Sequence, residues 1–120
     1  MPLRLYSVVV AAHDPAALAR FWTAALDFRI VHEAADGVVI ARDDHTYPGL
    51  IFEPMPEAKT TKNRLHLDLA PDDQTAEVLR LTALGAHRVQ IGQGADVSWV
   101  VLADPEGNEF CVLRSRPGGV

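Results

Sequence analysis

The sequence contains little cysteine, no cluster of basic residues and no long apolar run, and each of these absences narrows its function. The one cysteine, Cys111, has no partner for a disulfide within the chain, which favours a reducing cytoplasm. A formal net charge of −5 and the lack of a Lys/Arg run argue against binding to nucleic acid. The apolar runs are too short to cross a bilayer, and the first residues enter a strand pattern rather than a signal sequence. We therefore expect a cytoplasmic protein with neither nucleic acid nor a membrane as its partner.

The composition is that of an ordinary globular protein. Of the 120 residues, 48% are hydrophobic and 22% are charged, which suits one domain or two small half-domains that share a core. The acidic balance would favour a cationic small molecule over an anionic one.

The first half of the chain alternates between strand and helix patterns. Residues 3–11 are β-branched and apolar, which predicts a buried strand. Asp14 and Pro15 then mark a helix start, as N-cap and first helical residue. From residue 16 to residue 26 apolar side chains recur at spacings of three and four, as in an amphipathic helix. Three more strands are predicted at residues 28–33, 37–42 and 49–53.

After a linker at residues 54–63 the same pattern returns. Residues 64–70 alternate leucine with Arg64, His66 and Asp68, which predicts a strand with its leucines toward the core. An amphipathic helix follows, with Gly85 just beyond its end. The last strands are predicted at residues 88–91, 98–103 and 109–114, with a turn at residues 104–108.

The order β-α-β-β-β thus occurs twice, at residues 3–53 and 64–114. Neither half has enough strands to be stable alone. The sequence predicts an α+β fold in which two βαβββ repeats form a curved mixed sheet with a concave pocket and the helices behind it.

The two repeats can be aligned residue by residue. Superposing Ser7 on His66 sets an offset of 59 residues. The last strand of each repeat aligns at an offset of 58 residues, which places Glu53 near Cys111.

These features together resemble the vicinal oxygen chelate superfamily, which includes glyoxalase I, bleomycin-resistance proteins, fosfomycin-resistance proteins and extradiol dioxygenases. The resemblance covers nearly the whole chain and is closest to the small glyoxalase-like members. Besides the duplication, it is carried by three stretches: Asp14-Pro15…Phe21-Trp22…Leu26-Asp27-Phe28, His66-Leu67-Asp68, and Asp104-Pro105-Glu106-Gly107-Asn108-Glu109-Phe110.

The resemblance implies a metal site, because metal-dependent members hold a divalent metal with four His and Glu side chains on the concave face. In this sequence those positions fall on Ser7, Glu53, His66 and Cys111. Only Glu53 and His66 are of the usual types, so the resemblance implies these two as metal ligands and catalytic residues. Cys111 as a third ligand would suit zinc and would suit magnesium or manganese badly. Glu109, two residues earlier on the same strand face, is an alternative ligand.

Several of these residues also have a simpler interpretation. His66 and Asp68 could form a hydrogen-bonded pair on the sheet face, and Cys111 could be a small buried hydrophobe. Trp99 either stacks on a ligand or packs beneath a helix. The residues that we expect to line the pocket without catalysing a reaction are Ser7, Asp68, Trp99, Glu109 and Cys111.

Two functions remain open. The first is a lyase or isomerase in which a metal, zinc or another divalent ion, polarises substrate oxygens. The second is a metal-free protein that sequesters a small molecule, as the bleomycin-resistance branch does. A purely structural domain is a third reading. The resemblance further implies a homodimer.

Overall fold

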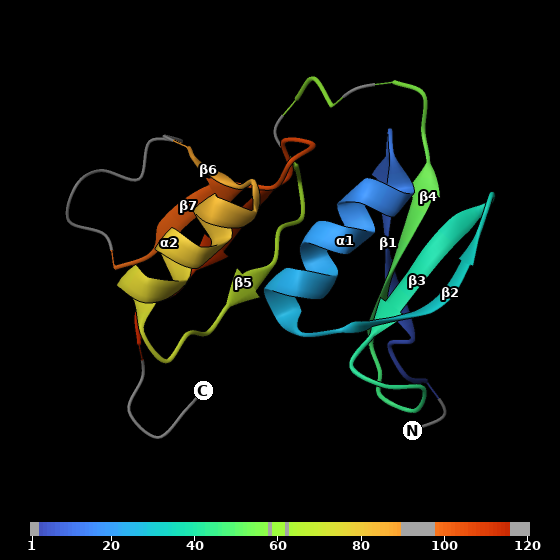
Figure 1. The fold of residues 1–120 in the computed structure, drawn as a ribbon, viewed down its shortest axis with the longest axis horizontal. Coiled ribbons are helices and arrows are strands. Elements are labelled where there is room, and N and C mark those ends of the chain that lie inside the picture. Colours follow the sequence, from blue (N-terminus) through green and yellow to red (C-terminus); the bar gives the residue numbers. More distant parts are fainter. Residues whose placement is uncertain (1–2, 58, 62, 90–97, 116–120) are drawn as a thin grey trace. The chain divides into compact units, whose positions relative to one another are not determined.

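A computed structural model describes residues 3–57, 59–61, 63–89 and 98–115. Its contacts divide the chain into two compact units, Met1–Ala58 and Lys59–Val120, and Figure 1 shows a sheet and a helix in each. The boundary between the units lies inside the predicted linker at residues 54–63.

Unit 1 is a four-stranded sheet with one helix on it. The strands lie in the order β1-β4-β3-β2 (Figure 1). β1 and β4 are parallel, although 36 residues separate the end of one from the start of the other, and the remaining neighbours are antiparallel. Its elements are β1 (Ser7–Ala12), α1 (Pro15–Leu26), β2 (Arg29–Ala34), β3 (Gly37–Ala41) and β4 (Gly49–Pro54).

Unit 2 repeats this plan. Its strand order is β5-β8-β7-β6, again with the first and last strands parallel and the other neighbours antiparallel. Its elements are β5 (Asp68–Leu69), α2 (Gln74–Leu84), β6 (His87–Arg88), β7 (Val100–Ala103) and β8 (Glu109–Val112). The predicted α+β fold of two βαβββ repeats is therefore confirmed.

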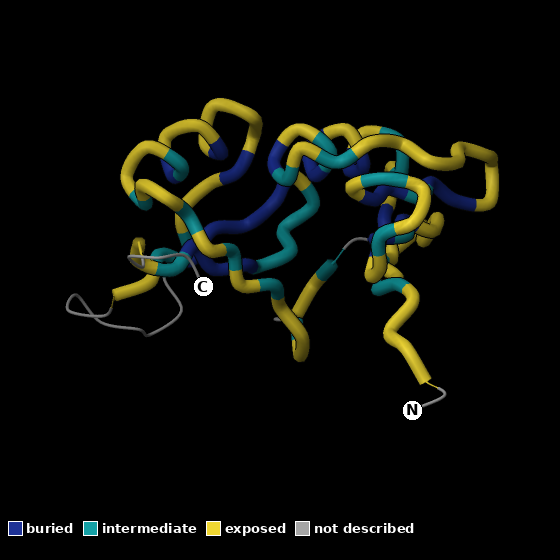
Figure 2. The backbone as a smooth tube through the Cα atoms, turned by 90° about the horizontal axis from the view of Figure 1, so that it is seen from below, coloured by how far each residue is buried: buried dark blue, intermediate teal, exposed yellow. Residues whose placement is uncertain are grey.

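The core of unit 1 forms between α1 and one face of the sheet. Phe21 and Trp22 of α1 are buried and meet edge to face, with ring centroids 5.2 Å apart. Leu18 of the same helix and Phe52 of β4 are also buried, and Figure 2 shows the buried stretches of the tube. Removing a large apolar side chain from water contributes about 1.5–3 kcal/mol, so these aromatic residues anchor the helix to the sheet.

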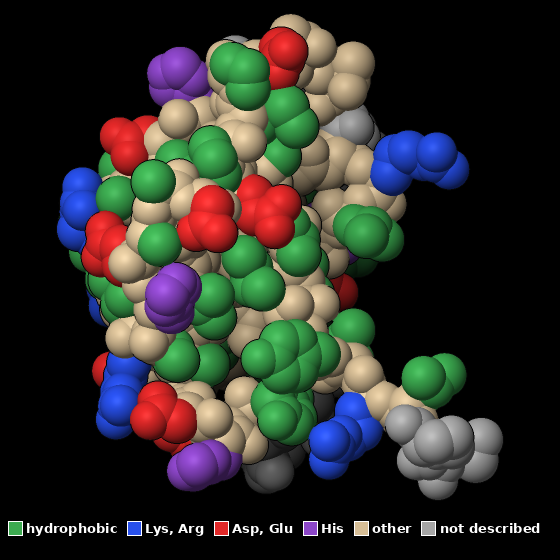
Figure 3. All heavy atoms as spheres, turned by 90° about the vertical axis from the view of Figure 1, so that its right-hand side faces the viewer, with side chains coloured by type: hydrophobic (Ala, Val, Ile, Leu, Met, Phe, Trp, Pro, Cys, Tyr) green, Lys and Arg blue, Asp and Glu red, His purple; other side chains and the backbone are tan. Residues whose placement is uncertain are grey.

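The opposite face of the unit 1 sheet is open by comparison. Val9, Ile51 and Val39 form one row across β1, β4 and β3, and Val9 is 53% exposed. Figure 3 looks onto the side where β2 and β3 lie in Figure 1, and there hydrophobic side chains lie among carboxylates and histidines.

Both helices begin in the same way. Asp14 accepts a hydrogen bond from the amide of Ala17 at 3.2 Å, and Asp73 accepts one from the amide of Ala76 at 3.1 Å. These bonds satisfy amides that have no partner within the helix. Neither α1 nor α2, the helices of the described residues, is long and apolar enough to cross a membrane.

Several strands are shorter than the sequence predicts. The run predicted at residues 3–11 becomes β1 only at Ser7, and Leu3 and Leu5 before it are exposed. In unit 2, β6, β7 and β8 also fall short of their predicted ends. The predicted loop at residues 92–94 lies outside the described residues.

The largest correction concerns the strand predicted at residues 64–70. Only Asp68 and Leu69 pair as a strand, and Leu65, predicted to face the core, is 83% exposed. The reason is a pair of hydrogen bonds from Asn63 to side chains at the start of β8, which hold the chain three residues before His66. The alternating pattern cannot reveal such long-range bonds, because it reflects only local periodicity.

The shared helix caps give the first testable prediction. Replacing Asp73 by Ala removes the acceptor of the Ala76 amide, and we expect a loss of about 1 kcal/mol in the free energy of unfolding. Urea denaturation measures it. Asp72→Ala, the same change at the exposed neighbouring position, should leave the midpoint unchanged, and equal losses in both variants would contradict the cap assignment.

Candidate metal centre

The candidate site is built on the parallel ladder between β5 and β8. Asp68 pairs with Cys111 in this ladder, and the amide of Cys111 donates a 2.9 Å hydrogen bond to the carbonyl of Leu67. Paired residues project from the same face of a sheet. The ladder therefore brings a carboxylate and a thiol together although they are 43 residues apart in sequence.

His66 joins these two residues from the chain just before β5. Its Nδ1 lies 3.2 Å from Oδ1 of Asp68. One donor atom from each of His66, Asp68 and Cys111 lies within 4.8 Å of the other two. The histidine and aspartate side chains are about half exposed, at 47% and 51%, whereas Cys111 is buried. The cluster thus has a buried sulfur end and an exposed nitrogen and oxygen end.

The donor set of this cluster fits zinc. Zinc accepts nitrogen, oxygen and sulfur ligands, with bonds of about 2.0–2.3 Å that place tetrahedral ligands about 3.5 Å apart. The three donor atoms, within 4.8 Å of one another, need only a small side-chain adjustment to reach that spacing. Three protein ligands would leave a fourth position open, as in catalytic zinc sites.

The strand register changes how the two repeats align. Asp68 follows Val9 by 59 residues, but their partners in the ladders, Cys111 and Ile51, differ by 60. The counterpart of Cys111 is therefore Ile51, and the alignment of Cys111 with Glu53 was two residues out of register. In the first repeat, the equivalent of the Asp68–Cys111 pair is an aliphatic pair.

Two of the predicted site residues belong to unit 1. Ser7 is the first residue of β1, is half-buried and pairs with Gly49. Glu53 is exposed near the end of β4, where it pairs with Ala11. Their joint participation with His66 in one site stays a prediction.

Trp99 lies just before β7, in unit 2, and its side chain is 39% exposed. It is therefore not fully packed beneath a helix. Its contact with a ligand stays a prediction.

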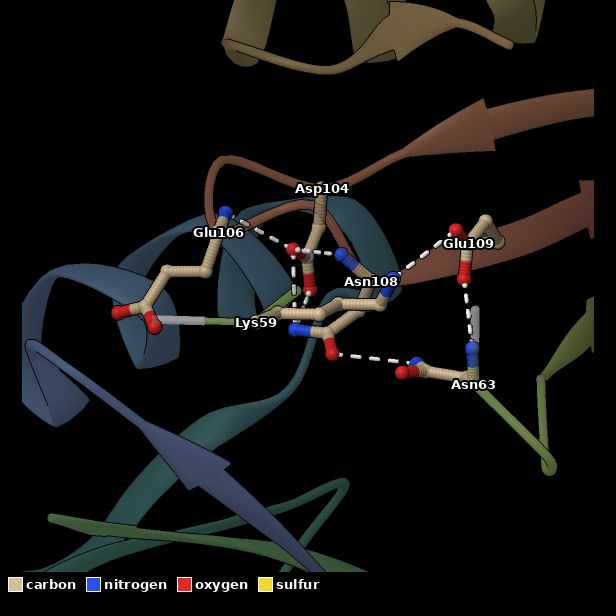
Figure 4. A network of polar contacts seen from close by, with 6 residues as sticks. All are labelled: Lys59, Asn63, Asp104, Glu106, Asn108 and Glu109. Atoms are coloured by element: carbon tan, nitrogen blue, oxygen red, sulfur yellow. Dashed lines mark hydrogen bonds and ion pairs between the residues drawn. The ribbon is translucent and has the colours of Figure 1, made fainter. Parts of the chain in front are cut away.

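Glu109, the first residue of β8, is engaged by the chain that leads into β5. Its Oε2 accepts a 3.0 Å hydrogen bond from the Lys59 ammonium, and its Oε1 accepts a 3.1 Å bond from the Asn63 amide (Figure 4). Burial raises the pKa of the Glu109 carboxyl, but the bonds from Asn63 and Lys59 outweigh this and hold the pKa below its usual value. Each oxygen of this carboxylate thus has a partner within the protein.

The turn before β8 is held by a buried carboxylate. Asp104 is fully buried, and its side chain accepts hydrogen bonds from the amides of Glu106 and Asn108 at 2.9 and 3.0 Å. The Asn108 side chain also donates to Asp104 and accepts a 3.1 Å bond from the Asn63 side chain (Figure 4). Gly107 has φ = 88°, a conformation that glycine adopts at little cost. The prediction that residues 104–108 form a turn is confirmed.

Lys59 and Asn63 were not identified from the sequence. Both lie in the stretch assigned to the linker, which has no periodicity, so no local signal marks them. The turn at residues 104–108 was recognisable, but its link to Asn63 spans 45 residues.

Comparisons with known proteins identify the family and the fold. A family profile described as "Glyoxalase-like domain" matches residues 7–113. No curated protein sequence gives a significant match.

Three solved structures are similar over most of this chain. An enzyme of the glyoxalase/bleomycin resistance protein/dioxygenase family from Burkholderia phytofirmans is 18% identical, with a TM-score of 0.73, over 95% of this chain and 100% of that one. A bleomycin-binding protein in complex with bleomycin is 19% identical, with a TM-score of 0.62, over 95% and 99%. The glyoxalase I of Leishmania major is 13% identical, with a TM-score of 0.68, over 93% and 86%. At these identities the similarity shows a shared fold.

The lowered pKa of Glu109 predicts a pH dependence of stability. A carboxyl with a lower pKa in the folded state stabilises the protein above its unfolded pKa of about 4.3. That contribution is lost as the pH falls through the folded pKa. We therefore expect the melting temperature to fall more steeply below about pH 5 in the wild type than in Glu109→Gln, which cannot lose a charge at this position.

Thermal melts monitored by circular dichroism at several pH values would measure this difference. Glu33→Gln removes an exposed carboxylate of β2 and should follow the wild-type curve. Parallel curves for the wild type and Glu109→Gln would show that Glu109 does not contribute to the acid sensitivity.

Proposed function

Because the chain belongs to the glyoxalase-like domain family, we propose that it binds a small molecule at the His66–Asp68–Cys111 cluster of unit 2, with a zinc ion held by these three residues. The observation that carries the proposal is the convergence of a nitrogen, an oxygen and a sulfur donor within 4.8 Å. When bound, zinc would polarise oxygen atoms of the ligand, the chemistry of a metal-assisted lyase or isomerase.

The residues of the cluster have different tasks in this proposal. Asp68 orients the His66 ring through the contact at Nδ1. Cys111 supplies a donor on the buried side, where its sulfur is sheltered from water. The exposure of His66 and Asp68 leaves the other side of the cluster accessible to a ligand.

A metal-free binding protein is the second candidate, and one observation favours it. His66 and Asp68 already satisfy each other at 3.2 Å, so the pair has no requirement for a metal. The two groups would then be polar contacts for a ligand, with Trp99 as an aromatic surface. The net charge of −5 would favour a cationic ligand. The bleomycin complex of a protein of this fold is consistent with such a role.

Metal content separates the two candidates. We expect close to one zinc per chain by plasma mass spectrometry, in protein purified without an affinity tag or chelator. His66→Ala removes one of three ligands, so its zinc content should fall at least tenfold. The variant should still fold, because the side chain is half exposed.

His87→Ala is the matched control, because it removes an exposed histidine of β6 from the same unit. It should keep the zinc content of the wild type. Absence of metal from the wild type, even after incubation with several divalent ions, would exclude the zinc proposal and leave the metal-free candidate. Unfolding of His66→Ala would instead assign His66 to the core.

We further propose that the protein is a homodimer in a reducing cytoplasm, as the resemblance and the single cysteine suggest. Light scattering should then return about twice the chain mass of 13.1 kDa. A monomer mass across a range of protein concentrations would exclude the dimer.

A further inference from the structure

The sheet ladder does not fix the position of His66. β5 begins at Asp68, and residues 64–66 lie outside any strand. Arg64 and Leu65 are exposed, so packing does not hold them either. Another interaction must determine where the imidazole stands relative to Cys111.

Two anchors on either side of His66 supply that constraint. After it, the carbonyl of Leu67 accepts the amide of Cys111. Before it, Asn63 donates its backbone amide to Glu109 and its side chain to Asn108. Residues 64–66 are therefore a three-residue bridge, and both of its ends are tied to β8 or to the residue before it.

We propose that Glu109 is a positioning residue that holds His66 in register with Cys111. Glu109 lies two residues before Cys111 on β8, so their side chains leave the same face of the strand. The carboxylate that holds the entry to the bridge and the sulfur of the cluster thus belong to one rigid element. The importance of this role for binding rests on the proposed function of the cluster.

The surroundings of Glu109 favour a positioning role over a ligand role. Its side chain is 15% exposed, and so competition from water for the bond to Asn63 is limited. Its other oxygen is held by Lys59. A metal bond would have to displace one of these partners, whereas His66 and Asp68 are exposed.

The anchor is itself supported from the turn. Asn108, which accepts from the Asn63 side chain, has its amide group held by both oxygens of buried Asp104 (Figure 4). This fixes the orientation of the Asn108 side chain, with its oxygen toward Asn63. The turn therefore stabilises the entry to the bridge through one further residue.

Two substitutions of Glu109 separate positioning from charge. Glu109→Ala removes the acceptor of the Asn63 amide. Glu109→Gln keeps an oxygen acceptor and loses only the charge that faces Lys59, so it should preserve the position of His66. Glu33→Ala, at an exposed position of β2, is the control for loss of a glutamate.

The first measurement needs no metal. In isotopically labelled full-length protein, we expect a nuclear Overhauser effect between the His66 ring protons and the β protons of Cys111. It should be lost in Glu109→Ala and kept in Glu109→Gln and Glu33→Ala. Retention of the effect in Glu109→Ala would overturn the positioning role.

The second measurement is zinc affinity, by competition with a chromophoric chelator. Groups that orient metal ligands typically change metal affinity by about 10–100-fold when they are removed. We expect a loss of at least tenfold in Glu109→Ala, and affinities within about twofold of the wild type in Glu109→Gln and Glu33→Ala. An unchanged affinity in folded Glu109→Ala would also overturn the positioning role.

The outcomes distinguish this inference from the proposed function. If the wild type binds no zinc, the zinc proposal fails, and the nuclear Overhauser effect alone decides the role of Glu109. If Glu109→Ala does not fold, Asn63→Ala tests the same anchor by removing its bond to Asn108. That variant should weaken the effect between His66 and Cys111, and an unchanged effect would contradict the proposal.

Discussion

The parallel pairing of the first and last strands of each unit is the constraint on which the rest of the structure depends. A parallel pair cannot close through a tight turn, so the chain between its strands must leave the ladder and return. Here that intervening chain supplies the helix and the other two strands of each unit. The same pairing places Asp68 beside Cys111, so one interaction determines both the topology and the candidate site.

The two units use this constraint for different purposes. In unit 1 the corresponding ladder pair is Val9 with Ile51, which can contribute only apolar surface. In unit 2 it is Asp68 with Cys111, and His66 stands where the first unit has Ser7. A duplicated backbone thus carries chemically distinct faces, and the metal-ligating cluster identified among the described residues lies in the second unit.

The sequence predicted those features that depend on neighbouring residues. The helix of unit 1, both N-caps and the turn at residues 104–108 follow from local patterns and were correct. The short β5 and the exposure of Leu65 could not be predicted, because Asn63 is held by residues 45 and 46 positions away. The proximity of His66, Asp68 and Cys111 lies between these cases. The repeat suggested it, but only the register of the ladder identifies which residues face one another.

The mutual contact of His66 and Asp68 does not decide between the two candidate functions. An exposed ion pair contributes about 0–1 kcal/mol, so a metal that binds both groups would replace it at little cost. Cys111 carries more weight in the comparison, because its buried sulfur could act as a zinc ligand without being extracted from the core. The cost of forming the centre then lies chiefly in bringing the imidazole to the sulfur. Residues 64–66 lack a ladder of their own, so that cost depends on how firmly the bridge is anchored at Asn63.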